Sequence, residues 1–214
     1  MASWPEPQAE PLAWRPGLSL VLASASPQRR EILGGLGLEF EVDPADVEEI
    51  AEGDPGRVAL ENARLKAREV AGRHDPARTV VLAADTVVAV EGRIVDKPAD
   101  EHEAAGAVGA LAGRGHEVWG AVVVAGPEGQ WREGLDRSEV CFRSLSPEEV
   151  REYVDTGEWR GRAGGYAIQL GGAGLVEAVE GDLENVVGLS TALVDRLVQG
   201  LVPAGGRPGD RYNR

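Results

Sequence analysis

The stretch Leu18-Ser-Leu-Val-Leu-Ala-Ser-Ala-Ser-Pro-Gln-Arg-Arg-Glu-Ile-Leu33 decides the fold class of this chain. Residues 18–23 form a short apolar run of the kind that makes a buried strand. Ser26 followed by Pro27 is typical of a helix N-cap with proline at the first helical position. A strand that leads directly into a helix favours an α/β fold.

Outward from this stretch, strand-like and helical segments alternate before strands cluster in the second half. The patterns predict further strands at residues 39–42, 79–90, 93–95, 117–125, 131–142, 166–169 and 174–179. They predict further helices at 57–71, at 101–111, from a capping box at Ser146 to about Gly157, and at 186–198. This order favours an α/β fold with a mixed, partly parallel sheet, flanking helices and two lobes. We expect one domain over residues 17–201, between an N-terminal extension of residues 1–16 and a disordered tail of residues 202–214.

Composition narrows the classes of partner. The 214 residues include 22 basic and 36 acidic side chains, a net charge of −14, which argues against non-specific binding to nucleic acid or a membrane surface. No apolar run approaches the roughly 20 residues of a membrane span. The one cysteine, Cys141, excludes an internal disulfide framework and a multi-cysteine zinc site. We therefore expect a soluble, cytoplasmic protein.

The basic residues are unevenly divided, with 20 arginines and only 2 lysines. The two lysines, Lys66 and Lys97, stand out because almost every other basic position is arginine. An ammonium is a compact point charge and a guanidinium is a wide planar fork, so lysine is expected where the fork does not fit. The two lysines are therefore candidate site residues.

The turn after the first strand is the first candidate site. A helix N-terminus presents free N–H groups and a positive dipole end to an anion. Ser24, Ser26, Arg29 and Arg30 add donors suited to phosphate oxygens. The alternative interpretation is an ordinary N-cap with solvent-facing arginines.

Asp85-Thr86 interrupts an otherwise apolar strand and is the second candidate. A carboxylate in such a strand is costly to bury unless it has partners or a function. The segment Asp96-Lys97-Pro98 could bring an ammonium towards Asp85. A bulge that exposes Asp85 to solvent is the alternative.

Two further segments carry weaker signals. Residues 46–49, Asp-Val-Glu-Glu, could supply oxygen ligands to a hard cation, although an acidic loop is more often simply solvated. Residues 160–169 combine Arg160, Arg162, a glycine pair and the amide of Gln169, which in an apolar setting needs polar partners. A glycine-rich turn with a half-buried amide is the alternative there.

Taken in order, these segments resemble the Maf family of nucleoside triphosphate pyrophosphatases. The resemblance rests on Leu22-Ala-Ser-Ala-Ser-Pro-Gln-Arg29, Ala84-Asp-Thr-Val-Val88, Lys97-Pro98 and Ala163-Gly-Gly-Tyr-Ala-Ile-Gln169, and it runs from about Leu18 to Leu201. It implies a mixed α/β fold with a nucleotide cleft between two lobes, a homodimer, and hydrolysis of a nucleoside triphosphate to the monophosphate and pyrophosphate with Mg²⁺ or Mn²⁺. The form of the last motif is similar to the branch that acts on dTTP and UTP.

The resemblance also implies roles for individual residues. Asp85 matches the catalytic aspartate that accepts a proton from water, and Glu49 and Asp85 match metal-binding positions. The implied substrate-binding and specificity residues are Ser24, Ser26, Gln28, Arg29, Lys66, Thr86, Lys97, Arg162 and Gln169.

Some positions depart from the family pattern. Gln28 stands where the pyrimidine branch usually has an arginine, Arg162 replaces a lysine, Leu170 a glycine and Ser190 a proline. The change at Gln28 leaves the fine specificity open. The alternatives are a nucleotide-binding regulator of cell division with little turnover, a pyrophosphatase of another or modified nucleotide such as 7-methylguanosine triphosphate, and a hydrolase of nucleotide-activated sugars or dinucleotides.

Overall fold

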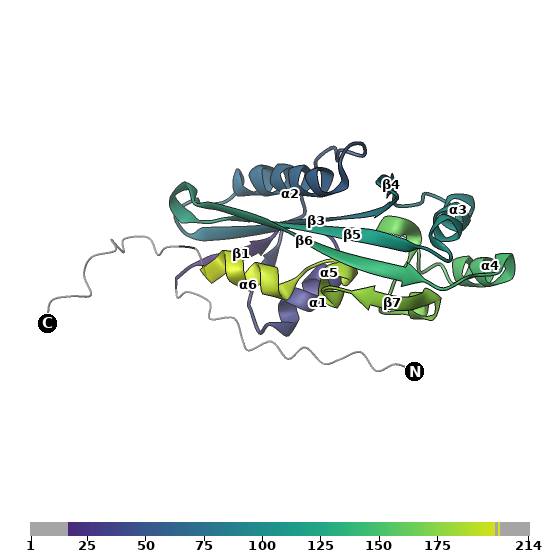
Figure 1. The fold of residues 1–214 in the computed structure, drawn as a ribbon. Helices are drawn as coiled ribbons and strands as arrows, with labels where there is room; N and C mark the ends of the chain where they lie inside the picture. Colours follow the sequence, from purple (N-terminus) through teal and green to yellow (C-terminus); the bar gives the residue numbers. More distant parts are fainter. Residues whose placement is uncertain (1–16, 200, 202–214) are drawn as a thin grey trace, which may run out of the picture.

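The computed structural model describes residues 17–199 and 201, and its strands form one seven-stranded mixed sheet (Figure 1). The central path is β2 (Glu41–Val42), β1 (Ser19–Leu22), β3 (Thr79–Val90), β5 (Gly115–Ala125), β6 (Trp131–Phe142) and β7 (Val176–Glu180). β1 lies parallel to both β2 and β3, and the remaining pairs are antiparallel, including that of β3 with β4 (Arg93–Val95). The predicted mixed, partly parallel sheet is confirmed.

Helices flank this sheet, as the sequence predicts. α2 (Pro55–Ala71) lies over one face, while α1 (Pro27–Gly35), α5 (Leu183–Val187) and α6 (Thr191–Gln199) lie on the other (Figure 1). α3 (Glu101–Leu111) and α4 (Pro147–Asp155) lie together at the far end of the long strands (Figure 1). The Ser26 side chain accepts from the backbone N–H of Arg29 at the start of α1, which confirms the predicted N-cap.

The core divides in a way that creates two lobes on one sheet. At one end, α1 and α6 pack on one face of the sheet, against side chains such as Leu82, and α2 packs on the other face, against side chains such as Val81. At the opposite end, α3 and α4 pack against a separate cluster that includes Val88 and Phe142. β3 runs through both ends, so Asp85 lies where one lobe meets the other.

The long strand β3 has an open stretch on one edge, and this stretch places the site. On that edge β1 pairs with Thr79–Leu82 and β4 pairs with Val88–Val90. Among residues 17–199 and 201, no strand therefore lies beside residues 83–87 on that edge, while β5 covers the other edge. Ligands in α/β sheets bind beyond the carboxyl ends of parallel strands, and β1 ends beside this opening.

Two predicted elements differ from the structure. Residues 166–169 are not a strand: Gly164 and Gly165 have φ of +70° and +71°, and the backbone N–H of Ala167 donates to the hydroxyl of Tyr153 instead of a strand partner. The predicted helix at 186–198 is wrong as one element. α5 ends where Gly188 takes a φ of +139°, a left-handed conformation that glycine adopts readily, and α6 begins at Thr191.

Two remaining predictions concern the chain termini and membrane-spanning segments. The predicted extension at residues 1–16 and tail at 202–214 lie outside the described residues. Within the described part, every helix is too short or too polar to cross a membrane.

Candidate active site

The open edge of β3 faces a cleft made of three adjoining pockets of about 250, 110 and 400 Å³. Lys97 lines all three pockets, so they form one connected cleft. Arg30, named with the turn after the first strand, is exposed and is not among the residues that line these pockets. The structure brings together every residue to which the family resemblance gives a role, because the pockets are lined by Ser24, Ser26, Gln28, Arg29, Glu49, Lys66, Asp85, Thr86, Lys97, Arg162 and Gln169.

Asp85, Lys66 and Glu49 form an ion-pair cluster in this cleft, in which Asp85 and Lys66 are buried and Glu49 is exposed. Asp85 is 3% exposed, and its side chain points to the α2 face of the sheet because side chains alternate along β3. The Nζ of Lys66, on α2, lies 2.6 Å from Oδ1 of Asp85 and 2.6 Å from Oε1 of Glu49. One ammonium therefore joins two carboxylates that come from distant parts of the chain.

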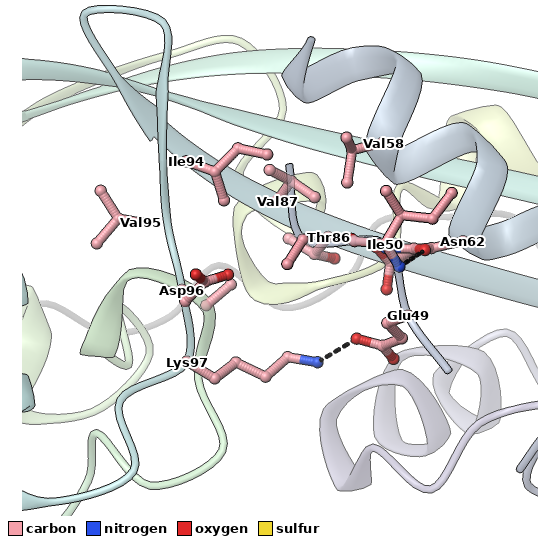
Figure 2. A pocket seen from close by; sticks show the side chains of 13 residues that line it. Glu49, Ile50, Val58, Asn62, Thr86, Val87, Ile94, Val95, Asp96 and Lys97 are labelled. Carbon is pink, nitrogen blue, oxygen red and sulfur yellow. Dashed lines mark hydrogen bonds and ion pairs between the residues drawn. The ribbon is translucent and has the colours of Figure 1, made fainter. Parts of the chain in front are cut away.

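Glu49 sits on the loop between β2 and α2 and is held by two lysines. Its Oε2 accepts from Nζ of Lys97 at 3.1 Å, across the pocket shown in Figure 2. Partial burial opposes ionisation, but the hydrogen bonds and charges of Lys66 and Lys97 outweigh it and lower the pKa of Glu49 to about 2. Glu49 is therefore ionised at pH 7.

An ammonium does contact Asp85, but it belongs to a different lysine from the one that the sequence suggested. The ammonium on Asp85 is that of Lys66, and Lys97 instead contacts Glu49. The reason is position: Lys66 lies on α2 over the face of β3 that carries Asp85, whereas Lys97 follows β4 at the outer wall of the pocket (Figure 2).

Arg29 forms hydrogen bonds with three separate segments of the cleft. Its Nε donates to the carbonyl of Gly188 at 2.9 Å, Nη1 to Oγ of Ser24 at 3.1 Å, and Nη2 to Oγ1 of Thr86 at 3.0 Å. Burial lowers the pKa of Arg29, an effect that nearby carboxylates partly offset. All three acceptors are uncharged, so the positive charge of the guanidinium remains available to an anion in the cleft.

Gln28 and Gln169 line the part of the cleft that lies beside α1 and α5. Oε1 of Gln28 accepts from the hydroxyl of Ser26 at 3.1 Å, which orients the amide so that its NH₂ is the end left for a ligand. Gln169 and Gln28 also line a neighbouring pocket of about 340 Å³ with Ile32 and Val187.

The largest of the three pockets is strongly cationic. Its lining includes a single carboxylate, Glu49, against the basic side chains of Arg29, Lys66, Lys97, Arg160 and Arg162. The chain as a whole carries −14, so this concentration of positive charge is local. Such a lining favours a ligand with several negative charges.

Two further residues belong to the site. Arg160, which the sequence places in the candidate segment 160–169, lines the cationic pocket, and Asn62 is a residue that no sequence motif singles out. Asn62 is 2% exposed, lines the pocket with Glu49 and donates to Oδ2 of Asp85 at 3.2 Å. A helical signal could have found it, because Asn62 and Lys66 are four residues apart and therefore share one face of α2.

The carboxylates suit a divalent cation that is shared with a ligand. Among the described residues, no three histidine, cysteine or acidic side chains gather as a metal cage. Glu49 and Asp85 do meet at one point, the ammonium of Lys66. Mg²⁺ is usually held by one or two carboxylates together with substrate phosphates, and the donor set fits that type of site.

Comparisons with known proteins show what this chain is similar to. The sequence model of the family described as "Maf-like protein" matches residues 19–201. The "dTTP/UTP pyrophosphatase" of Deinococcus radiodurans is 48% identical over 182 residues, which cover 85% of this chain and 92% of the relative. That of Thermococcus gammatolerans is 45% identical over 179 residues, covering 83% and 94%. A solved "dITP/XTP pyrophosphatase" from Mycobacterium abscessus is a distant likeness, at 20% identity and a TM-score of 0.41 over 60% of this chain and 76% of that one.

Proposed function

The chain belongs to the Maf-like family, and from this membership and the cleft we propose that it hydrolyses nucleoside triphosphates to the monophosphate and pyrophosphate. We propose dTTP and UTP as the preferred substrates, since the relatives at 48% and 45% identity carry that activity in their names. The observation that carries the proposal is the cationic pocket set directly against the Asp85–Lys66–Glu49 cluster, in which Asp85 and Lys66 are buried.

In the proposed reaction a water attacks the α-phosphorus. Asp85 orients the water and accepts its proton, the new bond joins the water oxygen to the α-phosphorus, and the bond from that phosphorus to the bridging oxygen breaks. Pyrophosphate leaves with the electron pair of that bond. The contacts of Asp85 to Lys66 and Asn62 fix its carboxylate, which keeps further lone pairs for the water.

Glu49 and Asp85 are the residues that would hold a divalent cation, Mg²⁺ or Mn²⁺. When bound, the cation neutralises charge that builds up on the phosphate oxygens. The ammonium of Lys66 already neutralises part of the charge of both carboxylates and keeps them together.

The remaining cations bind and orient the triphosphate. Arg29, Lys97 and Arg162 line the pocket beside the start of helix α1, where Ser24 adds a hydroxyl donor and the hydroxyl of Ser26 orients Gln28. Fixed donors of this kind stabilise charge on the leaving pyrophosphate without reorganising.

The nucleobase is the proposed ligand of the pocket that Gln28 and Gln169 line. An amide can both donate and accept, so Gln169 can pair with the carbonyl and N–H groups of uracil or thymine. Gln28 offers its free NH₂ beside it, and Thr86 contributes through its hydrogen bond to Arg29.

A panel of triphosphates tests this proposal. Purified protein is assayed for pyrophosphate and monophosphate with each common nucleoside triphosphate, 7-methylguanosine triphosphate, nucleotide sugars and dinucleotides, with Mg²⁺ or Mn²⁺. We expect the highest kcat/KM on dTTP and UTP. Equal or greater efficiency on 7-methylguanosine triphosphate, or on a nucleotide sugar, contradicts the substrate assignment. Tight binding of dTTP without pyrophosphate release points to the alternative of a nucleotide-binding regulator.

We further propose one catalytic domain over residues 17–201 that forms a homodimer in the cytoplasm. Light scattering of a chain limited to residues 17–201 and of the full chain checks this. We expect each of the two chains to have a mass near twice that of its own monomer, and the two chains to have equal activity.

A further inference from the structure

We infer that Asn62 is a positioning residue whose single side-chain amide holds the loop of Glu49 and the carboxylate of Asp85 in fixed relation. This inference rests on the proposed function, because it explains how the two carboxylates of that reaction are kept together. It adds a residue to which the sequence motifs assign no role.

The amide makes three contacts with two separate parts of the chain. Oδ1 accepts from the backbone N–H of Ile50 at 2.7 Å, and Nδ2 donates to the Ile50 carbonyl at 3.0 Å. Nδ2 also donates to Oδ2 of Asp85 at 3.2 Å. Ile50 directly follows Glu49, so one amide connects both carboxylates, and Figure 2 shows Asn62 reaching the loop from α2.

The loop depends on this contact for its backbone position. Residues 43–52 contain no helix or strand. Within the described part of the chain, the backbone of residues 45–53 makes two hydrogen bonds, and both join Ile50 to the Asn62 side chain. Glu49 is otherwise held through its side chain alone, by Lys66 and Lys97.

The amide leaves no alternative orientation. Its acceptor oxygen and both N–H groups are engaged, and a flipped amide would turn its oxygen towards the Ile50 carbonyl and the Asp85 carboxylate. Burial at 2% exposure removes water as a substitute partner, so each lost contact leaves a buried polar group unsatisfied. Asn62 therefore specifies one arrangement of loop and strand.

Two substitutions separate the parts of this role. Asn62→Leu removes all three hydrogen bonds at nearly the same size. Asn62→Asp keeps an acceptor for the N–H of Ile50, loses both donors and sets a second carboxylate against Asp85. Val70→Ala is the matched control: Val70 is fully buried on the same helix, eight residues or about 12 Å along the helix axis from Asn62, and it packs on the sheet.

The test measures kcat, KM and amide hydrogen exchange for the full chain with dTTP and Mg²⁺, well below the melting temperature of each variant. We expect both Asn62 variants to lose at least about tenfold in kcat with KM within about threefold, since substrate contacts stay in place. The Ile50 amide should exchange at least about tenfold faster in Asn62→Leu and stay protected in Asn62→Asp. Val70→Ala should change neither.

Other outcomes overturn the inference. A kcat of Asn62→Leu or Asn62→Asp within about threefold of wild type removes the positioning role. An equal loss of kcat in Val70→Ala shows that helix stability alone explains the effect. A wild-type protein without turnover on any triphosphate refutes the proposed function instead. The exchange of the Ile50 amide then still tests whether Asn62 holds the loop of Glu49.

Discussion

Replacing Lys66 by methionine isolates the electrostatics of the site. The side chain of Lys66 is 10% exposed, and its ammonium lies 2.6 Å from a carboxylate oxygen of Glu49 and 2.6 Å from one of Asp85. Methionine keeps the apolar stem and removes the charge. The two carboxylates are then left facing each other, with Asp85 only 3% exposed to bulk solvent.

The expected cost follows from this geometry. Breaking a buried pair by removing one partner typically destabilises a protein by about 3–5 kcal/mol, because an uncompensated charge stays behind. For a chain of this size that corresponds to a fall in Tm of roughly 6–20 °C. Lys97→Met is the matched control, since its side chain is 48% exposed and it makes one contact of 3.1 Å with the same Glu49. A surface pair of that kind contributes about 0–1 kcal/mol.

Urea unfolding of the two variants and wild type at pH 7 measures the difference. Adding Asp85→Asn to Lys66→Met should recover about 1–3 kcal/mol, because it removes one of the unpaired charges. If Lys66→Met unfolds within about 1 kcal/mol of wild type, or no more easily than Lys97→Met, the ammonium does not hold the two carboxylates together and the reasoning is refuted.

Four further outcomes are expected. Asp85→Asn should keep the fold by circular dichroism and lose at least about a hundredfold in kcat, since an amide cannot accept the proton of water; near-normal turnover would remove Asp85 from that role. Lys66→Arg and Lys97→Arg should each lower kcat/KM at least about tenfold, or 1.4 kcal/mol, because a planar fork does not fit a point-charge site, and Tm should change little in Lys97→Arg, whose side chain is 48% exposed; wild-type kinetics in both contradicts this. Gln28→Arg should tighten triphosphate binding by about 1–2 kcal/mol through an added charge-assisted hydrogen bond, and an unchanged KM for every nucleotide argues against any ligand contact. The pKa of Glu49 lies at about 2 in the folded protein and near 4.5 in the unfolded chain, so its contribution to stability is full above about pH 5 and is lost as pH falls towards 2. Between about pH 5 and pH 2 the unfolding free energy of Glu49→Gln should therefore fall less than that of wild type. Equal falls in the two proteins contradict the assignment.

The elements that carry strong local signals are predicted well by the sequence. The strand at residues 79–90 and the helix at 101–111 agree with β3 and α3 at both ends. Asp85 was found because a carboxylate in an apolar strand needs a reason to be there, and Lys66 and Lys97 because lysine is scarce in this chain.

The misplaced features depend on contacts between distant residues. Residues 166–169 have an apolar pattern, but the hydroxyl of Tyr153 takes the backbone hydrogen bond that a strand would use. The helix break at Gly188 coincides with the bond from Arg29 to its carbonyl. Lys66 and its partner Asp85 are 19 residues apart, and Asn62 contacts Ile50 and Asp85, which are 12 and 23 residues away from it. Contacts over these separations leave no local pattern in the sequence.

The bond that breaks is the most direct test of the proposed chemistry. Turnover of dTTP in ¹⁸O-labelled water, followed by mass spectrometry of the products, locates the attacked phosphorus. Attack at the α-phosphorus predicts one ¹⁸O atom in thymidine monophosphate and unlabelled pyrophosphate, in equal amounts. Label in pyrophosphate, or formation of the diphosphate with labelled inorganic phosphate, would show that water attacks a different phosphorus and that the cleft does not work in the way described.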